Sequence, residues 1–419
     1  MRKVCVLGLG YIGLPTAAMF ATHGLQVVGV DINGSVVDML NNGEIHIEEV
    51  GLRALVREAM VSGRLAVQSA PERSDAFIIA VPTPVRADKA ADMRAVTAAA
   101  ESIVPHLCRD NLVVLESTSP PRTTVDLVRP ILERSGLRAG EDFLLAYSPE
   151  RVLPGRILEE LVENARVIGG INPASAEAGR DLYLAFVQGE ISLTDATTAE
   201  MVKLMENTYR DVNIALANEF ALVAEQTGVD VWQAMHIANH HPRVHILQPG
   251  PGVGGHCIAV DPWFIVQAAP ASTPLIQAGR KVNDAMPRHV VGLVKRAVEG
   301  CEQPVIACLG LTYKANVDDI RQSPAVEVVR MLQEEGFQVR AYDPYAGARV
   351  LPCQVASLLD AVTGSDCLVI LTDHRAFDSL SPGQIGPLMR TKIVVDTRNC
   401  LAHEAWLEDG FQSILLGKS

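Results

Sequence analysis

A glycine-rich turn close to the start of the chain constrains the possible folds more than any other feature. The sequence predicts a buried strand over residues 3–7 and a helix over 14–23, and Gly8, Gly10 and Gly13 lie between them with the spacing G-x-G-x-x-G. In this arrangement the first glycine allows a tight turn, the second lets a pyrophosphate approach the backbone, and the third lets the helix pack on the strand. The turn therefore predicts a βαβ unit that binds a dinucleotide at the helix N-terminus.

A carboxylate after the next predicted strand makes this prediction more specific. That strand covers residues 26–31, and Asp31 stands 18 residues after Gly13. A carboxylate there can accept hydrogen bonds from both ribose hydroxyls and would repel the extra phosphate of NADP, so NAD is the expected cofactor. Tyr11 and Ile12, inside the turn, are expected to contact it as well. The alternative is a tight strand–helix turn without a ligand.

Strands and helices continue to alternate after this unit. The sequence predicts strands at 65–68, 76–81, 112–116 and 143–147, and helices at 92–104 and 122–135. Such alternation is typical of a doubly wound parallel sheet. Thr83 and Thr118 each follow a strand at the edge that carries the glycine turn. We expect them to line the cofactor crevice, and ordinary proline-rich turns are the alternative.

The chain changes character in its middle. Residues 196–227 contain neither Gly nor Pro and keep apolar residues at helical spacing, which predicts one long helix. From residue 304 the strand–helix alternation returns, without a glycine fingerprint. Strands are predicted at 305–311, 338–342, 367–371 and 392–396, and a helix at 324–335. We therefore expect an α/β protein with two Rossmann-like doubly wound domains, 1–194 and 301–419, joined by a helical central domain, 195–300. The long helix would serve as a spine or as the face of a homodimer.

Charge and composition exclude several classes of protein. The net charge of −13 argues against a nucleic-acid partner, which requires a basic face. None of the eight cysteines forms a Cys-x-x-Cys pair, which indicates free thiols in a reducing compartment. No run of 18 apolar residues predicts a membrane span, and a strand that begins at residue 3 leaves no room for a signal peptide. We therefore expect a cytoplasmic protein without a membrane partner.

Candidate catalytic side chains lie in two segments of the middle region. Lys203, Asn207 and Arg210 follow at i, i+4 and i+7, on one stripe of the long helix. A solvated polar stripe is the alternative. Cys257 lies in the loop 249–262, whose many glycines let the backbone approach another group closely. An exposed thiol there could capture an aldehyde, and a nearby lysine could hold the resulting oxyanion.

Histidines gather around the same loop. They are His236, His240, His241, His245 and His256. Their spacing does not match a zinc signature, and no carboxylate triad accompanies them. We expect a polar loop that lines a substrate and no metal site.

Taken together, these motifs resemble those of the UDP-glucose/GDP-mannose dehydrogenase family from residue 3 to about 400. The shared pieces are the glycine turn with Asp31, Ser148-Pro-Glu150-Arg151, Lys203 with Asn207, Gly254-Gly-His-Cys257 with Asp261, and the stretch from Tyr313-Lys314 to Arg321-Gln-Ser-Pro324. Within the family, segments 201–219 and 241–264 most resemble those of members that oxidise UDP-N-acetyl-D-mannosamine.

The resemblance implies a four-electron oxidation of the C6 alcohol of a UDP-sugar to the uronic acid, with NAD as acceptor. Cys257 would attack the intermediate aldehyde, and a second hydride transfer would leave a thioester for water to hydrolyse. Lys203 would be the acid/base and oxyanion partner, with Asn207 beside it. Asp261 and Glu150 would position or activate the water.

The resemblance also implies further binding residues. Those expected to hold the substrate are Arg151, Val152, Lys203, Asn207, Arg210, His241, Arg243 and Gly254, with Tyr313, Lys314 and Arg398 from the second nucleotide-binding fold. Those expected at the cofactor, beyond the glycine turn, are Thr83, Thr118, Thr124 and Arg321. The chain departs from the family at Arg122, which replaces the usual glycine in Ser117–Thr124 and leaves the role of Thr124 open.

Alternatives stay open at this stage. UDP-N-acetylglucosamine or UDP-glucose could be the sugar. A two-electron dehydrogenase of the hydroxyacid type would use only Lys203 and Asn207, with Cys257 structural. The cysteine loop and the second nucleotide-binding fold argue against that. A further alternative is a non-catalytic protein that senses NAD or a nucleotide-sugar. The presence of all the reactive side chains together argues against it.

Overall fold

The computed structural model describes residues 1–47, 49–153, 155–255, 257–347 and 350–418. The chain forms two compact units. The first consists of Met1–Glu206 and Trp263–Pro270, and the second of Asn207–Pro262 and Ala271–Ser419. Each unit contains a sheet with helices on both faces, and a helical stretch lies between the sheets in sequence, which confirms the predicted fold class. The domain boundaries at 194 and 300 stay a prediction.

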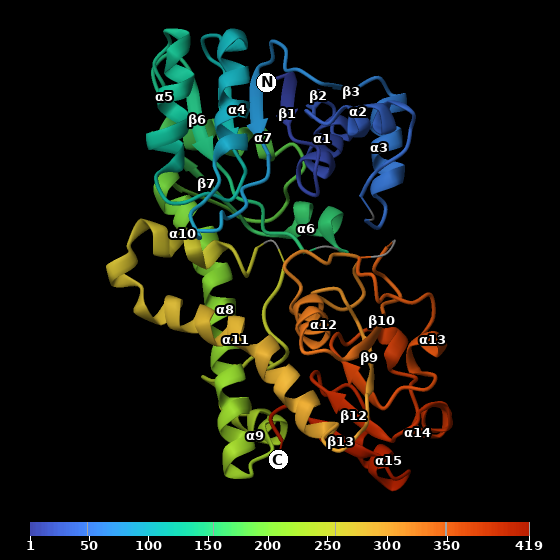
Figure 1. Cartoon of the computed structure of the whole chain (residues 1–419). Helices are drawn as coiled ribbons and strands as arrows, with labels where there is room; N and C mark the ends of the chain where they lie inside the picture. The colour runs from blue at the N-terminus through green and yellow to red at the C-terminus, as the bar shows by residue number, and fades with distance from the viewer. Residues whose placement is uncertain (48, 154, 256, 348–349, 419) are drawn as a thin grey trace. The chain divides into compact units, whose positions relative to one another are not determined.

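The first unit contains an eight-stranded sheet in the order β3-β2-β1-β4-β5-β6-β7-β8 (Figure 1). Neighbouring strands are parallel except β6 and β7, which are antiparallel. The strands are β1 Lys3–Leu7, β2 Gln26–Val30, β3 Leu65–Gln68, β4 Ala76–Ile79, β5 Leu112–Leu115, β6 Leu144–Tyr147, β7 Arg166–Gly170 and β8 Ile191–Asp195. The central strands are apolar throughout because helices cover both faces.

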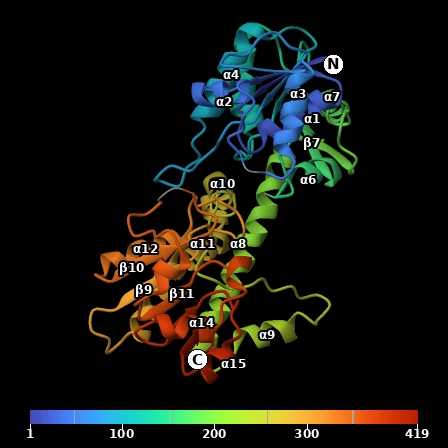
Figure 2. The ribbon, with the colours of Figure 1, turned by 90° about the vertical axis from the view of Figure 1, so that its right-hand side faces the viewer.

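Two layers of helices enclose this sheet, as Figures 1 and 2 show. One layer comprises α1 Gly13–Thr22, α2 Gly34–Asn41, α3 Leu52–Val61, α6 Ile157–Glu163 and α7 Pro173–Tyr183. The other comprises α4 Arg94–Ile103, α5 Arg129–Leu132 and the first residues of α8 Ala196–Thr227. A π-helical turn over Thr124–Val128 leads into α5.

The parallel strands β1, β4 and β5 are neighbours, so their carboxyl ends meet at one edge of the sheet. The glycine turn follows β1, Thr83 follows β4 and Thr118 follows β5. Ligands of open α/β sheets bind at this kind of edge. The topology therefore positions the candidate cofactor residues together.

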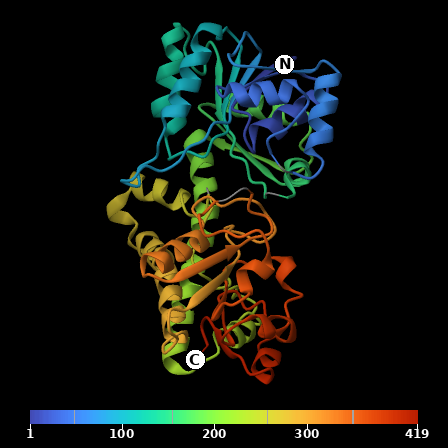
Figure 3. The same cartoon turned by 45° about the vertical axis from the view of Figure 1, so that its right-hand side comes forward.

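The second unit contains a five-stranded parallel sheet in the order β10-β9-β11-β12-β13 (Figure 3). The strands are β9 Val305–Leu309, β10 Gln338–Tyr342, β11 Cys367–Ile370, β12 Ile393–Asp396 and β13 Gln412–Leu415. One face packs against α11 Pro274–Ala297 and α12 Pro324–Glu334. The other face packs against α13 Leu358–Val362, α14 Pro382–Ile385 and α15 His403–Glu408.

The C-terminal half of α8 and the short helix α9 Val231–Ala238 form a hairpin in the second unit (Figures 1 and 2). Small residues of α8, such as Ala217 and Ala221, pack against Val231 and Met235 of α9. The end of the chain docks on this hairpin, because Trp232 donates its indole N–H to the carbonyl of Leu416 at 2.8 Å. After a loop, α10 Asp261–Ala268 begins.

All ten strands predicted from the sequence are present, with ends within about two residues of the prediction. The long helix has the predicted bounds. Three further strands, β7, β8 and β13, were not predicted. None of the helices in the described ranges is both long and apolar enough to cross a membrane.

Candidate active site

The three glycines of the turn differ in the space that a side chain would find: one faces open space, and two are enclosed by neighbouring atoms. Gly8 has a φ of +92°, and a Cβ there would lie 2.5 Å from the carbonyl oxygen of Ala80. A Cβ on Gly13 would overlap the carbonyl of Gly8. Around Gly10, by contrast, no atom lies within 4 Å of a built Cβ. Gly8 and Gly13 are therefore required by packing, whereas Gly10 leaves space at the helix N-terminus for a pyrophosphate.

Asp31 holds the turn from the neighbouring strand. Its carboxylate accepts hydrogen bonds from the backbone N–H groups of Leu9 and Asn33, both at 2.9 Å. Asn33 in turn caps α2. A carboxylate oxygen has two lone pairs, so each oxygen can accept a ribose hydroxyl in addition. The residues present thus fit NAD, with Tyr11 and Ile12 half-buried in the same turn.

Two strand ends beside the turn are joined by side-chain hydrogen bonds. The Thr83 hydroxyl donates to the carbonyl of Thr118 at 2.6 Å. The Ser117 hydroxyl donates to the carbonyl of Val81 at 2.7 Å and accepts the N–H of the same residue at 2.9 Å. The structure therefore brings the predicted pair Thr83 and Thr118 together.

The departure at Arg122 has a structural explanation. Arg122 has a φ of +75°, a left-handed conformation in which glycine is usual. Its guanidinium forms a two-bond ion pair with Asp126, four residues along, and lies exposed. Its backbone N–H, like both the N–H and the hydroxyl of Thr124, donates to the buried carboxylate of Glu200 on α8. Sequence reasoning missed Glu200, whose only signal was its place three residues before Lys203.

Glu150 and Arg151, the predicted pair after β6, have different partners. The Glu150 carboxylate accepts the N–H of Arg151 at 2.7 Å and pairs with the buried Arg166 of β7. Arg166 also pairs with Glu116 at 3.5 Å, and burial raises the pKa of Glu116 to about 7 although Arg166 opposes it. The Arg151 guanidinium pairs with Glu206 at 2.7 Å. Val152 packs partly buried on the first core.

Cys257, the candidate nucleophile, and two of its predicted partners belong to the second unit. Cys257 and Cys108 are the exposed cysteines among the eight. The carbonyl of Cys257 accepts the N–H of Asp261 at 2.8 Å, which makes the cysteine part of the turn that begins α10. The side chain of Asp261 accepts a hydrogen bond from the amide of Asn207 at 2.5 Å. Lys203 lies buried one turn earlier on α8.

The glycine-rich loop packs against the segment after β9. A Cβ on Gly255 would lie 2.7 Å from the ring of Tyr313, and one on Gly254 would lie 2.7 Å from the Cβ of Tyr313. The N–H of Gly255 donates to the carbonyl of Arg321 at 2.9 Å. Burial raises the pKa of Tyr313 to about 12, with nearby Asp319 and Cys257 adding to the shift and Arg321 and Arg210 opposing it. The cysteine loop thus contacts Tyr313, a predicted substrate residue, and Arg321, a predicted cofactor residue.

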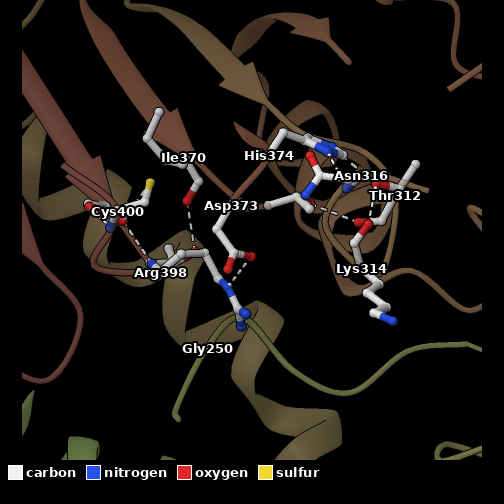
Figure 4. A network of polar contacts seen from close by, with 12 residues as sticks. Gly250, Thr312, Lys314, Asn316, Ile370, Asp373, His374, Arg398 and Cys400 are labelled. Atoms are coloured by element: carbon white, nitrogen blue, oxygen red, sulfur yellow. Dashed lines mark hydrogen bonds and ion pairs between the residues drawn. The ribbon is translucent and has the colours of Figure 1, made fainter. Parts of the chain in front are cut away.

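Arg398 follows β12 and reaches the same loop (Figure 4). A Cβ on Gly250 would overlap its guanidinium, and its Nε donates to Asp373 at 3.0 Å. Lys314 accepts a hydrogen bond at its carbonyl from Thr312, while its side chain points away from that cluster in Figure 4. Lys314 and Arg398 follow β9 and β12 at the carboxyl edge of the second sheet, where an anionic ligand would bind.

The second sheet has its own carboxylate in the place of Asp31. Asp343 follows β10 and accepts the N–H groups of Leu311 and Thr312. The buried ring of His374 occupies the space beside it: its Nδ1 accepts the N–H of Asn316, so its Nε2 donates to Asp343 at 3.1 Å (Figure 4). This carboxylate is engaged by protein groups, which agrees with the absence of a glycine fingerprint here.

The histidine-rich segment lies on the surface. His241 and Arg243 are exposed, and their side-chain nitrogens approach each other to 3.5 Å. His236 and His240 contact edge to face. In the described ranges, no three His, Cys, Asp or Glu side chains come together as a metal site would require. His256 lies outside the described residues.

Three models of the UDP-glucose/GDP-mannose dehydrogenase family match the chain. The NAD-binding domain matches residues 2–187, the central domain 197–285 and the UDP-binding domain 307–403. A curated UDP-N-acetyl-D-mannosamine dehydrogenase from Methanococcus maripaludis is 50% identical over 100% of this chain and 97% of the relative. An NDP-N-acetyl-D-galactosaminuronic acid dehydrogenase from Ralstonia solanacearum is 50% identical over 95% of this chain and 96% of the relative.

Solved structures agree with these matches. The UDP-D-ManNAc dehydrogenase of Pyrococcus horikoshii has a TM-score of 0.94 at 44% identity and covers 100% of this chain and 99% of its own. The UDP-N-acetyl-mannosamine dehydrogenase of Staphylococcus aureus has a TM-score of 0.92 at 47% identity, with the same coverage. The likeness therefore extends over both units.

Proposed function

Because the chain belongs to the UDP-glucose/GDP-mannose dehydrogenase family, we propose that it oxidises the C6 alcohol of UDP-N-acetyl-D-mannosamine to the uronic acid, using two molecules of NAD. The observation that carries this proposal is the exposed Cys257 on a loop packed against Tyr313, with the Asn207–Asp261 pair beside it. The reaction consumes one alcohol, one water and two NAD, and yields one carboxylate, two NADH and three protons.

The first step removes a hydride from C6 and a proton from its hydroxyl group. Gly10 and Asp31 would hold NAD, which would supply the hydride acceptor. We assign the proton to Lys203, whose amine lies buried on α8 and acts as general base. Asn207, one turn further on the same helix and fixed by Asp261, is assigned to the substrate oxygen.

The second step needs a nucleophile, because the aldehyde carbon cannot donate a hydride until it has gained a fourth substituent and become tetrahedral. The Cys257 thiolate forms a bond to C6, and we assign the stabilisation of the resulting oxyanion to Lys203. Loss of the second hydride leaves a thioester. Water then attacks C6 and gives one proton to Asp261 or Glu150. The C–S bond breaks with its electron pair on sulfur, which regenerates the Cys257 thiolate, and the uronic acid loses its carboxyl proton to solvent.

A protein with a net charge of −13 must gather cations to bind a diphosphate. We assign Arg398 and Lys314 to the UDP group and Arg210, His241 and Arg243 to the rest of the substrate. Arg151 and Val152, from the first unit, are assigned to the sugar. Thr83, Thr118, Thr124 and Arg321 are assigned to NAD.

We also propose that the protein is a cytoplasmic homodimer formed through its central helices. Large apolar side chains lie exposed along α8 at helical spacing: Met205, Tyr209, Leu216, Phe220 and Val223. A stripe of this length is typical of a helix that packs against a partner. A second copy of the same helix is the partner that fits it, since symmetric dimers pair identical surfaces.

The sugar is tested by measuring NADH production with UDP-N-acetylmannosamine, UDP-N-acetylglucosamine, UDP-N-acetylgalactosamine and UDP-glucose in parallel. We expect the highest kcat/KM with the first. A higher value with another sugar would correct the substrate. Absence of NADH with all four would contradict the dehydrogenase itself. Cys257→Ala, with Cys108→Ala as a matched exposed control, should lose uronate formation while the control keeps it.

A further inference from the structure

Glu200 is a buried carboxylate to which the reaction above assigns no role. It lies on α8, is fully buried, and accepts three hydrogen bonds from one short loop. The donors are the N–H of Arg122 at 2.5 Å, the N–H of Thr124 at 2.7 Å and the hydroxyl of Thr124 at 2.6 Å. One carboxylate therefore binds both ends of a three-residue turn.

That turn belongs to the loop that follows β5 at the cofactor edge. The loop covers residues 117–124 and is braced internally, since Ser119 and Thr123 donate to carbonyls within it. Its other end is joined to the residues after β4 through the Ser117–Val81 and Thr83–Thr118 hydrogen bonds. Val81 in turn lies against the glycine turn, 3.1 Å from a Cβ built on Gly8.

A continuous series of contacts thus runs from α8 to the cofactor turn within the first unit. We propose that Glu200 is a positioning residue for NAD: it fixes the loop 117–124, and through it the end of β4 against which the glycine turn is packed. The left-handed backbone of Arg122 contributes to this positioning, because it directs the N–H of Arg122 at the carboxylate of Glu200.

The charge of Glu200 is set by opposing effects. Burial raises its pKa to about 7, while the bonds from Thr124 and Arg122 lower it, and the neighbouring Asp126 raises it further. The other charged groups here are the Arg122 guanidinium, which is paired with Asp126, and Lys203 one turn along α8. Because a protonated carboxyl accepts fewer hydrogen bonds, the loop should loosen as the pH falls through about 7.

The test is the dissociation constant of NADH, measured by fluorescence without sugar at pH 6, 7 and 8. It depends on the NAD site and not on the identity of the sugar, so it can fail independently of the proposed function. We expect wild-type binding to weaken from pH 8 to pH 6. In Glu200→Gln the side-chain NH₂ group, itself a donor, would face the N–H donor of Arg122. NADH should therefore bind about tenfold more weakly at pH 8, and its dissociation constant should not change between pH 8 and pH 6.

Asp142→Asn is the matched control, because Asp142 also accepts a backbone N–H but lies before β6, at the opposite edge of the sheet. It should bind NADH like the wild type. Thr124→Val removes one donor without a change of charge, and should weaken NADH binding about threefold even if Glu200→Gln does not fold. Wild-type binding independent of pH, or binding by Glu200→Gln or Thr124→Val as tight as that of the wild type, would overturn the proposal.

Discussion

At the scale of single residues, the three glycines of one motif are required for different physical reasons. Gly8 and Gly13 are enclosed by backbone, whereas Gly10 faces open space. The first two are therefore demanded by the fold and the third by the ligand. This separation gives a test of the cofactor site that a general loss of stability cannot imitate.

Gly10→Ala should leave the fold intact, because no described atom outside its two chain neighbours lies within 4 Å of the added methyl group and the backbone is not left-handed. It should nevertheless weaken NADH binding at least about tenfold, since the methyl group occupies the space that the pyrophosphate requires. Gly383→Ala, equally open but on α14, controls for the change of residue. A Gly10→Ala protein with wild-type affinity for NADH would contradict the placement of the phosphates.

At the scale of elements, what could be predicted from sequence depended on how local the signal is. The bounds of α8 followed from 32 residues with helical periodicity and no Gly or Pro. The glycine turn and Cys257 were found because their spacing is itself the signal. By contrast, β7 was missed because Arg-Val-Ile-Gly-Gly is short and ends in glycines, and it proved antiparallel to β6.

Pairings between distant elements could not be predicted. Glu200 accepts hydrogen bonds from donors that lie 76 and 78 residues away in sequence, and no pattern in either segment predicts this contact. Asp343 follows β10 as Asp31 follows β2, but only the fold reveals that His374, 31 residues later, occupies the space beside Asp343. Sequence spacing reports local geometry, whereas such contacts are set by the order of strands in the sheet.

The second carboxylate predicts how the second unit responds to acid. Burial alone would raise the pKa of Asp343, but hydrogen bonds from His374 and from the backbone N–H of Leu311 and Ala346 hold it well below its usual range. A depressed pKa contributes stability above the unfolded value of about 4 that is lost as the pH falls through the folded value.

Asp343→Asn should therefore lower the free energy of unfolding by about 2 kcal/mol at pH 7. The difference from the wild type should begin to shrink below about pH 4, where the unfolded wild type binds a proton that the folded carboxylate does not yet bind. Urea titrations at pH 7, 5 and 3.5 measure this. A difference that stays constant over this range would show that the charge of Asp343 does not stabilise the unit.

At the scale of the whole molecule, the stripe on α8 predicts assembly. Leu216→Glu places a charge within it and should convert the proposed dimer to a monomer, because an unpaired charge is costly to bury in an interface. Leu359→Glu, on an exposed position of α13, should leave the assembly unchanged. Light scattering after size-exclusion chromatography gives both masses. A Leu216→Glu protein that keeps the wild-type mass would exclude the stripe as the interface.

The NAD-binding turn lies in the first unit, and Cys257 with the Asn207–Asp261 pair lies in the second. The central claim is that the thiol retains the half-oxidised sugar so that a second NAD can be reduced. The most direct test is the number of NADH molecules formed per UDP-sugar consumed, measured to completion with limiting sugar. We expect two NADH molecules per UDP-sugar. A value of one would show a two-electron dehydrogenase in which Cys257 is not a nucleophile.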